Sequence, residues 1–456
     1  MSKVATRSVD LGRVKTSTRI IEKYSIIPIL ACVYAAIVSP LMIVTCSPSD
    51  AACLLESRPE NKIFWPLLAA ISVVLAVRNS SRLTFPPHII CLFAYLAFAG
   101  ASVLWAFKPE LSFIRFAQQV MVVTSIVLPA LLATRAADLM RGLFLCFAIA
   151  AILNLFFVFG RPPIDFKYAT WGYPGYFSGK NYLGQFATIA LLLSLHEALN
   201  RGLRRAFGVV VAIIAIALLV LSNSKTSIGL ALLVPLLAAV TLLIRKATRI
   251  SPAILLLSIP LCYFVFASVT GFSVNRLSYM LYGDPTFTGR TIIWDFAHYE
   301  IARKPLLGWG YQSFWLVGPD APSIVDAPGW VKGMPNAHNG YLDTVLEMGY
   351  VGLLLLVAFI AATLHAIGRL ADRDFVSAWL VLSLALHIII TNGLESLWMR
   401  GFEMLWIVFL ILAAEIGRHW RPLLSTGAAY RSRRPRPGNP GPVRGASRPA
   451  AARTAL

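Results

Sequence analysis

Two residues, Arg290 and His338, are of types that bind anions and move protons, and both lie in one polar stretch of an otherwise apolar chain. Arg290 follows a glycine and stands four residues before Trp294. Its guanidinium can bind two phosphate oxygens at once. His338 lies within residues 336–340 (Asn-Ala-His-Asn-Gly), where a neutral imidazole can accept a proton or orient a hydroxyl. The residues alone leave two alternatives open: an arginine bound to a lipid headgroup, and a histidine bonded only to backbone.

Further polar residues extend the candidate site beyond His338. Asn339, Asp343 and Glu347 follow one another at intervals of four residues, so they share one face of a helix that begins beside His338. We expect Asn339 and Asp343 to contact the substrate.

Three more cations are candidates for the same surface. Lys225 lies in a short turn between two apolar runs, where a cation is expected to have a partner. Lys180, after Gly179, and Arg115, after Pro109, also fall at the ends of apolar runs on the predicted outer side. If all three meet Arg290, they would suit an anion such as a diphosphate. Taken singly, each can also be a snorkelling residue at a helix end.

The elements that position these residues are apolar helices. The chain of 456 residues is 57% hydrophobic and 14% charged, and its mean hydropathy is +0.70. A soluble protein surface cannot be this apolar. We predict an all-α polytopic membrane protein with about 12 transmembrane helices and one long outer loop. The predicted spans are 26–46, 63–77, 88–107, 117–134, 141–160, 182–198, 206–222, 227–245, 252–269, 348–368, 375–392 and 402–417.

Basic residues orient these helices. Most Lys and Arg lie at the two termini and in alternate short loops, which predicts that both termini are cytoplasmic and that the long loop is outside. The tail has too few large apolar residues to fold. The predicted parts are a basic cytoplasmic N-terminus (1–24), transmembrane helices 1–9 (25–269), the large outer loop with the motifs (270–340), transmembrane helices 10–12 (341–418) and a disordered basic cytoplasmic tail (419–456).

Several function classes are disfavoured. The net charge of +20 does not indicate nucleic-acid binding, because the basic residues do not follow one face of a domain. No metal or cofactor is expected: the one Asp-x-Asp, at 372–374, falls on the predicted inner side, and zinc-type and ATP-binding spacings are lacking. An activated substrate would supply the energy. Whether Cys46 and Cys53, beside the first outer loop, form a disulfide is left open.

Taken in order, these motifs resemble the bacterial O-antigen ligase and polysaccharide polymerase superfamily, and most closely its exopolysaccharide polymerase branch. The resemblance covers about Trp105 to Glu395. The matching pieces are Ser102-Val103-Leu104-Trp105 with Pro109 and Arg115, Phe177-Ser178-Gly179-Lys180-Asn181, Ser222-Asn223-Ser224-Lys225-Thr226, Gly289-Arg290 through Trp294, Leu307-Gly308-Trp309-Gly310, and Ala337-His338-Asn339-Gly340-Tyr341-Leu342.

The resemblance implies a GT-C-like glycosyltransferase at the periplasmic face of the bacterial inner membrane. It would be metal-independent and inverting, and its donor would be an oligosaccharide linked to undecaprenyl diphosphate. Other polysaccharide-assembly proteins are further expected partners, besides the lipid bilayer itself. By motif, Arg290 would hold the leaving diphosphate and His338 would act as base or orienter. Lys225 stands where family members often carry arginine, so the charge is kept and the two-pronged grip is lost.

Polymerisation of lipid-linked repeat units of a cell-surface or exopolysaccharide is the function that we expect. One alternative is an O-antigen ligase that transfers a lipid-linked glycan to lipid A core, because the motifs are common to both. A secondary transporter is the alternative from another class. Transporters usually have internal repeats and ionisable residues near the bilayer midplane, and neither is found in this sequence.

Overall fold

The computed structural model describes residues 23–45, 59–133, 136–160, 171–273 and 289–418, together with the short pieces 275–276, 279–280, 283 and 286–287. Cys46, Cys53, the predicted tail 419–456 and residues 1–22 of the predicted N-terminal part lie outside these ranges. Every residue that was predicted for the candidate site lies within them.

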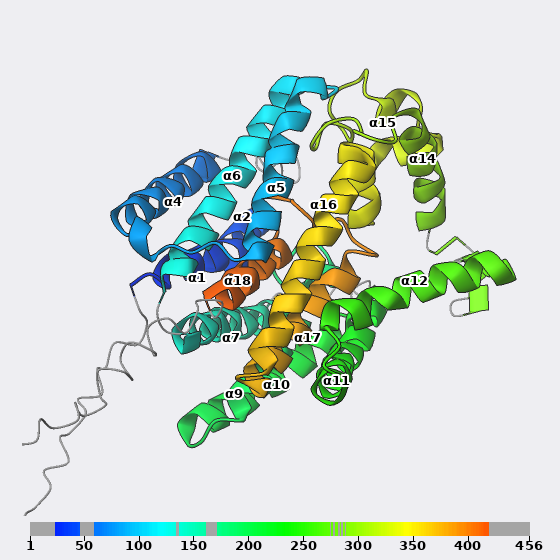
Figure 1. Ribbon diagram of the computed structural model, residues 1–456. Helices are drawn as coiled ribbons and strands as arrows, with labels where there is room; N and C mark the ends of the chain where they lie inside the picture. The colour runs from blue at the N-terminus through cyan, green and yellow to red at the C-terminus, as the bar shows by residue number, and fades with distance from the viewer. Residues whose placement is uncertain are drawn as a thin grey trace, which may run out of the picture. The chain divides into compact units, whose positions relative to one another are not determined.

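The described residues form helices and loops with no β-strand (Figure 1). Each predicted span coincides with a helix, and the predicted all-α membrane fold is confirmed. In chain order the helices are α1 (Ile26–Val33), which continues through a π-helical turn (Tyr34–Val38) into α2 (Ser39–Thr45), α4 (Pro59–Arg78), α5 (Pro87–Ala101), α6 (Pro109–Leu132), α7 (Ala136–Gly160), α9 (Lys180–Ala198), α10 (Leu203–Leu221), α11 (Lys225–Thr248), α12 (Pro252–Thr270), α14 (Arg290–Arg303), α15 (Pro322–Val325), α16 (Gly340–Ala371), α17 (Phe375–Thr391) and α18 (Met404–Arg418).

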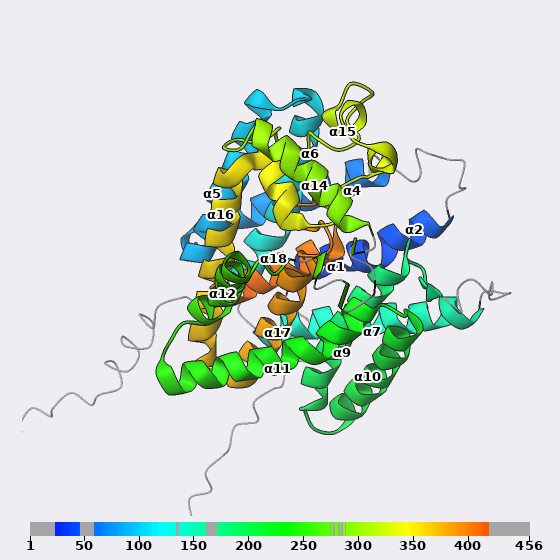
Figure 2. The same cartoon turned by 90° about the vertical axis from the view of Figure 1, so that its right-hand side faces the viewer.

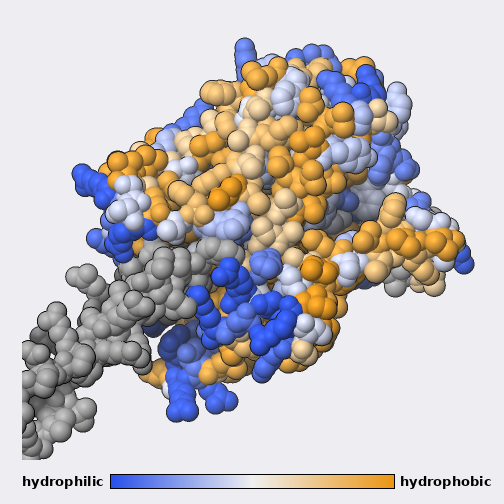
Figure 3. All heavy atoms as spheres, in the orientation of Figure 1, coloured by the Kyte–Doolittle hydropathy of each residue, from blue (hydrophilic) through white to orange (hydrophobic). Residues whose placement is uncertain are grey.

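Eight helices of the described residues are long and apolar enough to cross a membrane. They are α4, α5 with the turn that follows it, α6, α7, α10, α11, α12 and α16. Apolar side chains cover most of the visible face over α5, α16 and α12 (Figure 3). The predicted number of about twelve spans stays a prediction, because α17 and α18 have only 17 and 15 residues and α9 carries several polar ones.

The core of the bundle is built around α18. Every residue of α18 from Met404 to Gly417 is buried, and the helix packs against α5, α6, α16 and α17 (Figures 1 and 2). A helix that is apolar on all sides needs neighbours on all sides. Its burial fixes the surrounding helices and therefore the loops that leave their ends.

The segment from α14 to the start of α16 has a hydrophobic core of its own. Its largest members are aromatic: Phe296, Trp309, Phe314 and Trp315. The backbone N–H of Trp309 donates to the carbonyl of Leu346 in α16 at 3.0 Å, and its carbonyl accepts from Phe107 N at 2.9 Å. The segment is thus held to α16 and to the residue pair before α6, and α14 lies beside the first turns of α16 (Figure 1).

The helical spacing of Ile293, Phe296, Ala297 and Glu300 predicts a helix over residues 290–303, and α14 has these bounds. The same spacing would allow the helix to lie flat on the bilayer, but its apolar side is buried in protein instead. Ile293, Phe296 and Ala297 are buried in the second core, because residues 305–339 fold back over them. The apolar side of α14 is therefore covered by protein.

Glu300 lies in the last turn of α14 and stabilises this end of the helix through Arg303. Its side chain is fully buried, and each carboxylate oxygen accepts from Nη1 of Arg303 at 3.1 Å. Arg303 also donates to Asp326 at 2.6 Å. Burial raises the pKa of Glu300 above its ordinary value, and the nearby Arg303 opposes this rise.

Helix α16 starts at Gly340, beside His338 as the spacing of Asn339, Asp343 and Glu347 predicts and eight residues before the predicted span 348–368, and it bends at Gly349. Gly349 has φ +64°, and a Cβ atom there would lie 2.0 Å from the carbonyl oxygen of Leu306. Only glycine meets both conditions without strain. The bend turns the first two turns of α16, which follow His338, toward residues 290–339.

Candidate functional site

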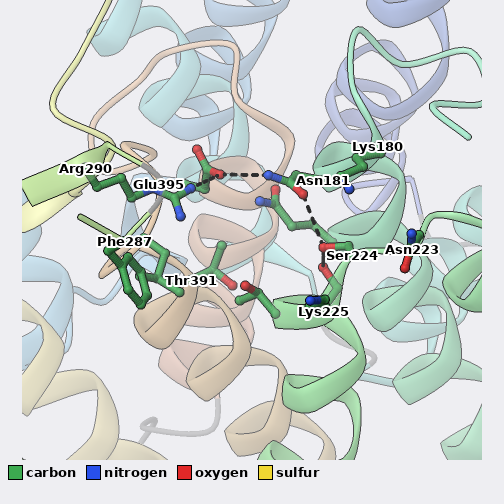
Figure 4. A pocket seen from close by; sticks show the side chains of 13 residues that line it. Lys180, Asn181, Asn223, Ser224, Lys225, Phe287, Arg290, Thr391 and Glu395 are labelled. Carbon is green, nitrogen blue, oxygen red and sulfur yellow. Dashed lines mark hydrogen bonds and ion pairs between the residues drawn. The ribbon is translucent and has the colours of Figure 1, made fainter. Parts of the chain in front are cut away.

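A pocket of about 360 Å³ opens where four parts of the chain meet (Figure 4). These parts are the first turns of α9 and α11, which lie side by side, the start of α14, and the segment after α17 (Figure 2). The lining residues are Lys180, Asn181, Gln185, Asn223, Ser224, Lys225, Thr226, Ser227, Phe287, Arg290, Thr391, Leu394 and Glu395.

The three cations of the pocket are each the first residue of a helix. Lys180 begins α9, Lys225 begins α11 and Arg290 begins α14. Glu395 is the one acidic residue of the lining within the described part of the chain, so the formal charge there is three positive against one negative. The predicted convergence of Lys180, Lys225 and Arg290 is present in the structure.

The ends of these helices add to the positive potential. At the N-cap positions Gly179, Ser224 and Gly289, no side chain accepts a hydrogen bond from a backbone N–H group of the first turn. Backbone N–H groups of a first turn carry a positive partial charge, and a basic residue there is unfavourable unless an anion is near. Three helices with a cation at this position therefore suit a multiply charged anion.

Glu395 joins the cations to the histidine. Its Oε1 accepts from Nη2 of Arg290 at 3.1 Å and from Nδ2 of Asn181 at 3.4 Å (Figure 4). Its Oε2 lies 3.1 Å from Nδ1 of His338. The side chains of Arg290 and Glu395 are each 18% exposed, so this ion pair is shielded from water yet reachable from the pocket.

His338 stands behind Glu395 and does not line the pocket itself. A carboxylate only accepts hydrogen bonds, so in the neutral ring the proton is on Nδ1 and the lone pair is on Nε2. The His338 side chain is 32% exposed. Its Nε2 is thus suited to accept a proton from a hydroxyl.

Arg115 does not lie in this pocket, contrary to the expected convergence. Its Nη1 donates to the backbone carbonyl of Gln312. Residues 311–313 fold over the start of α6, where Ser112 Oγ donates to the Tyr311 carbonyl at 2.7 Å. Arg115, three residues along the same helix, is therefore bound by residues 311–313.

Asn339 and Asp343 are turned inward rather than toward the pocket. The Asn339 side chain caps α16 by accepting from the N–H groups of Tyr341 and Leu342. Asp343 is 2% exposed, and both of its oxygens have donors. Neither residue lines the pocket. The shared helix face that the spacing predicts exists, but it packs against protein.

Glu395 and Asn181 line the pocket although neither is among the residues predicted for the site. Glu395 lies just after the predicted span 375–392, in the polar run 392–396 (Asn-Gly-Leu-Glu-Ser). An acidic residue at an outer helix end, on the side of three predicted cations, was the available signal. Asn181 was visible only as the neighbour of Lys180.

Comparison with known proteins agrees with the motifs. Residues 210–357 match the O-antigen ligase family. The chain is 28% identical over 304 residues to the exopolysaccharide production protein ExoQ of Rhizobium meliloti, which is 62% of this chain and 66% of that protein. It is 30% identical over 93 residues to a candidate polysaccharide ligase of Rickettsia conorii, 20% of this chain and 23% of that protein. The chain thus aligns with less than two thirds of each relative, and the predicted family resemblance is confirmed.

Proposed function

We propose that this chain of membrane helices, of which residues 210–357 match the O-antigen ligase family, is a glycosyltransferase that polymerises repeat units linked to undecaprenyl diphosphate. An acceptor sugar hydroxyl attacks the anomeric carbon of the donor glycan. The bond from that carbon to the diphosphate oxygen breaks, and the hydroxyl proton passes to His338. The products are a longer glycan and undecaprenyl diphosphate, and attack from the face opposite the leaving group inverts the anomeric centre.

The observation that carries this proposal is that the carboxylate of Glu395 contacts both a cation of the pocket and the imidazole of His338. Three cations at helix N-termini surround the pocket, and Glu395 bonds both Arg290 and His338. A reaction with an anionic leaving group and a hydroxyl nucleophile needs these two devices side by side.

The three cations stabilise the leaving group. As the bond to the anomeric carbon breaks, negative charge grows on the diphosphate, and fixed positive groups stabilise that state. Arg290 can bind two diphosphate oxygens in a fork, whereas Lys180 and Lys225 act as point charges. Because the chain itself supplies these charges, we propose that the reaction needs no metal, and we expect it to continue in the presence of EDTA.

His338 accepts the proton of the attacking hydroxyl. Hydrogen bonding of Nδ1 to Glu395 orients the ring and stabilises the imidazolium that forms when Nε2 takes the proton. Before the donor binds, Glu395 also neutralises the charge of Arg290 through their ion pair. A diphosphate would compete with Glu395 for that guanidinium, leaving the carboxylate to His338.

The lipid-linked donor explains why the pocket lies at the ends of membrane helices. The polyprenyl chain can remain in the bilayer while the diphosphate enters between α9, α11 and α14. We place this end at the periplasmic face of the bacterial inner membrane and both termini in the cytoplasm, which the distribution of Lys and Arg supports.

We propose the polymerase as the first candidate and the ligase as the second, and the comparisons contain support for each. The longest of the reported matches, 304 residues, is to a protein named for exopolysaccharide production, while the match to the Rickettsia conorii ligase candidate covers 93 residues. Transfer of a lipid-linked glycan to lipid A core is the second candidate, and that shorter match supports it.

The test is elongation by the purified protein. In lipid nanodiscs, the protein is given a repeat unit on undecaprenyl diphosphate, and glycan length is followed on gels with and without EDTA. The proposal expects a ladder of longer glycans in both conditions. Transfer only when lipid A core is added would instead identify a ligase.

Two variants separate chemistry from folding in this assay. His338→Ala is expected to abolish the ladder while the protein still binds undecaprenyl diphosphate. Arg205→Ala is the control. Arg205 is exposed in the first turn of α10, near the end of α9 that is opposite the pocket, so this variant should elongate glycans normally. Normal elongation by His338→Ala would contradict the role of the imidazole.

A further inference from the structure

We propose that Asp343 is a positioning residue, which sets the place of the His338 imidazole through the backbone of Ala337. Asp343 has no contact with the pocket, so its effect would pass through the loop that carries the base. The proposal rests on the proposed function, because this task exists only if His338 takes part in the reaction.

The backbone of His338 needs such support. Its φ angle is +49°, in the left-handed region that residues other than glycine seldom adopt. A residue is held there only when its surroundings determine the conformation, and such residues gather at functional sites. A bond made by the neighbouring peptide group can therefore decide where the imidazole points.

Both sides of Ala337 are held by side chains. Its N–H donates to the two carboxylate oxygens of Asp343, at 3.1 and 3.2 Å. Its carbonyl accepts from the indole N–H of Trp294 at 3.0 Å. On the far side of His338, the N–H of Asn339 donates to Ser396 Oγ at 3.0 Å. The histidine is thus clamped between two fixed peptide groups.

The clamp connects the elements that bring the other site residues. Trp294 lies one helical turn after Arg290 in α14, and Ser396 follows Glu395 in the chain. A shift of the Ala337 peptide would therefore move His338 relative to both. The 3.1 Å contact between His338 and Glu395 depends on this arrangement.

Asp343 is rigid enough for the task. Its Oδ1 accepts from the indole N–H of Trp315 at 2.8 Å, and Oδ2 lies 3.4 Å from Nη2 of Arg400. The side chain is 4% exposed. A carboxylate buried with these partners cannot turn toward a substrate, and its removal would leave the Ala337 N–H without its acceptor.

Glu347, one helical turn further along α16, provides a matched control. It bonds the same Arg400, at 2.8 Å, and is similarly buried, but its other oxygen accepts from Gln312 N, far in sequence from the histidine loop. Asp343→Leu and Glu347→Leu both remove a buried carboxylate from Arg400. Only the first also frees the Ala337 peptide.

The experiment measures kcat and the donor KM for both variants in the elongation assay, together with thermal unfolding. We expect both to unfold at lower temperature. Asp343→Leu should also lose kcat on the order of 100-fold with an unchanged donor KM, as expected when a catalytic group is displaced by about 1 Å. Asp343→Asn, which keeps an oxygen for the Ala337 N–H, should retain most of kcat.

Three results would overturn the proposal: full kcat in Asp343→Leu, equal losses of kcat in Asp343→Leu and Glu347→Leu, or an Asp343→Asn as slow as Asp343→Leu. If Asp343→Leu does not fold, Trp294→Phe frees the other side of Ala337 and should lower kcat alone, and a normal kcat there also overturns the proposal. Failure of the wild-type protein to elongate glycans would instead refute the proposed function.

Discussion

Replacing Glu395 by glutamine should move donor affinity and turnover in opposite directions. Glu395 carries the single negative charge of the pocket lining within the described residues, and it contacts both Arg290 and His338. Glu395→Gln keeps the shape of the side chain and removes the charge. The pocket then holds three cations without a carboxylate, so a diphosphate no longer competes for Arg290.

The contacts set the size of the two effects. Unit charges about 4 Å apart attract by about 4 kcal/mol at an effective dielectric constant near 20, but partly exposed pairs contribute about 1 kcal/mol net. At 18% exposure of both side chains we take the lower figure, which is about fivefold tighter donor binding. Glutamine can still accept a hydrogen bond from His338, but it has no charge to stabilise the imidazolium. A hydrogen bond to a charged group contributes about 1.5–3 kcal/mol and one between neutral groups about 1 kcal/mol, so the loss of the charge should lower kcat about 3-fold to 30-fold.

Steady-state elongation kinetics with the lipid-linked donor give both values for the wild-type protein and Glu395→Gln. Asp295→Asn is the matched control, because it removes an exposed acidic charge from α14 outside the pocket and should change neither value. Weaker donor binding with an unchanged kcat in Glu395→Gln would refute the reasoning, because it would make Glu395 a donor ligand rather than the competitor of the diphosphate.

Three further predictions concern other groups. Arg290→Lys keeps the charge but cannot form a two-pronged bond, so kcat/KM should fall about 10-fold or more, and an unchanged kcat/KM would exclude the fork. Lys180→Ala and Lys225→Ala should each weaken binding of undecaprenyl diphosphate by about 1.5–3 kcal/mol in titration calorimetry, and unchanged binding in either would remove that lysine from the site. Because burial raises the pKa of Glu300, its contribution to stability is present below its ordinary pKa of 4.5 and is lost as the pH rises through the raised value. Glu300→Gln should therefore make the unfolding temperature less dependent on pH above 4.5, and an unaltered pH profile would contradict this assignment.

The sequence predicts much of the fold because each membrane helix reveals itself locally. The apolar runs locate the helices, and the spacing of Ile293, Phe296 and Ala297 gives α14 its bounds. Charge and hydropathy also predict that Lys180, Lys225 and Arg290 lie at turns on one side of the membrane, which allows them to meet but places Arg115 with them wrongly.

What the sequence leaves out depends on contacts between distant segments. Nothing local shows that residues 305–339 fold over α14 or that residues 311–313 take up Arg115. The helical spacing of Asn339 and Asp343 gives a shared face, but which neighbour that face meets is decided by Arg400 and Trp315. Glu395 is invisible for the same reason, since its partners come from three other parts of the chain.

The central claim is that Lys180, Lys225 and Arg290 together bind a diphosphate beside the His338–Glu395 pair. The most direct measurement is a cryo-electron microscopy structure of the protein in nanodiscs with undecaprenyl diphosphate. The account predicts the diphosphate among these three cations, with Arg290 released from Glu395 and His338 still bonded to it. Diphosphate bound elsewhere, with the ion pair between Arg290 and Glu395 intact, would contradict it.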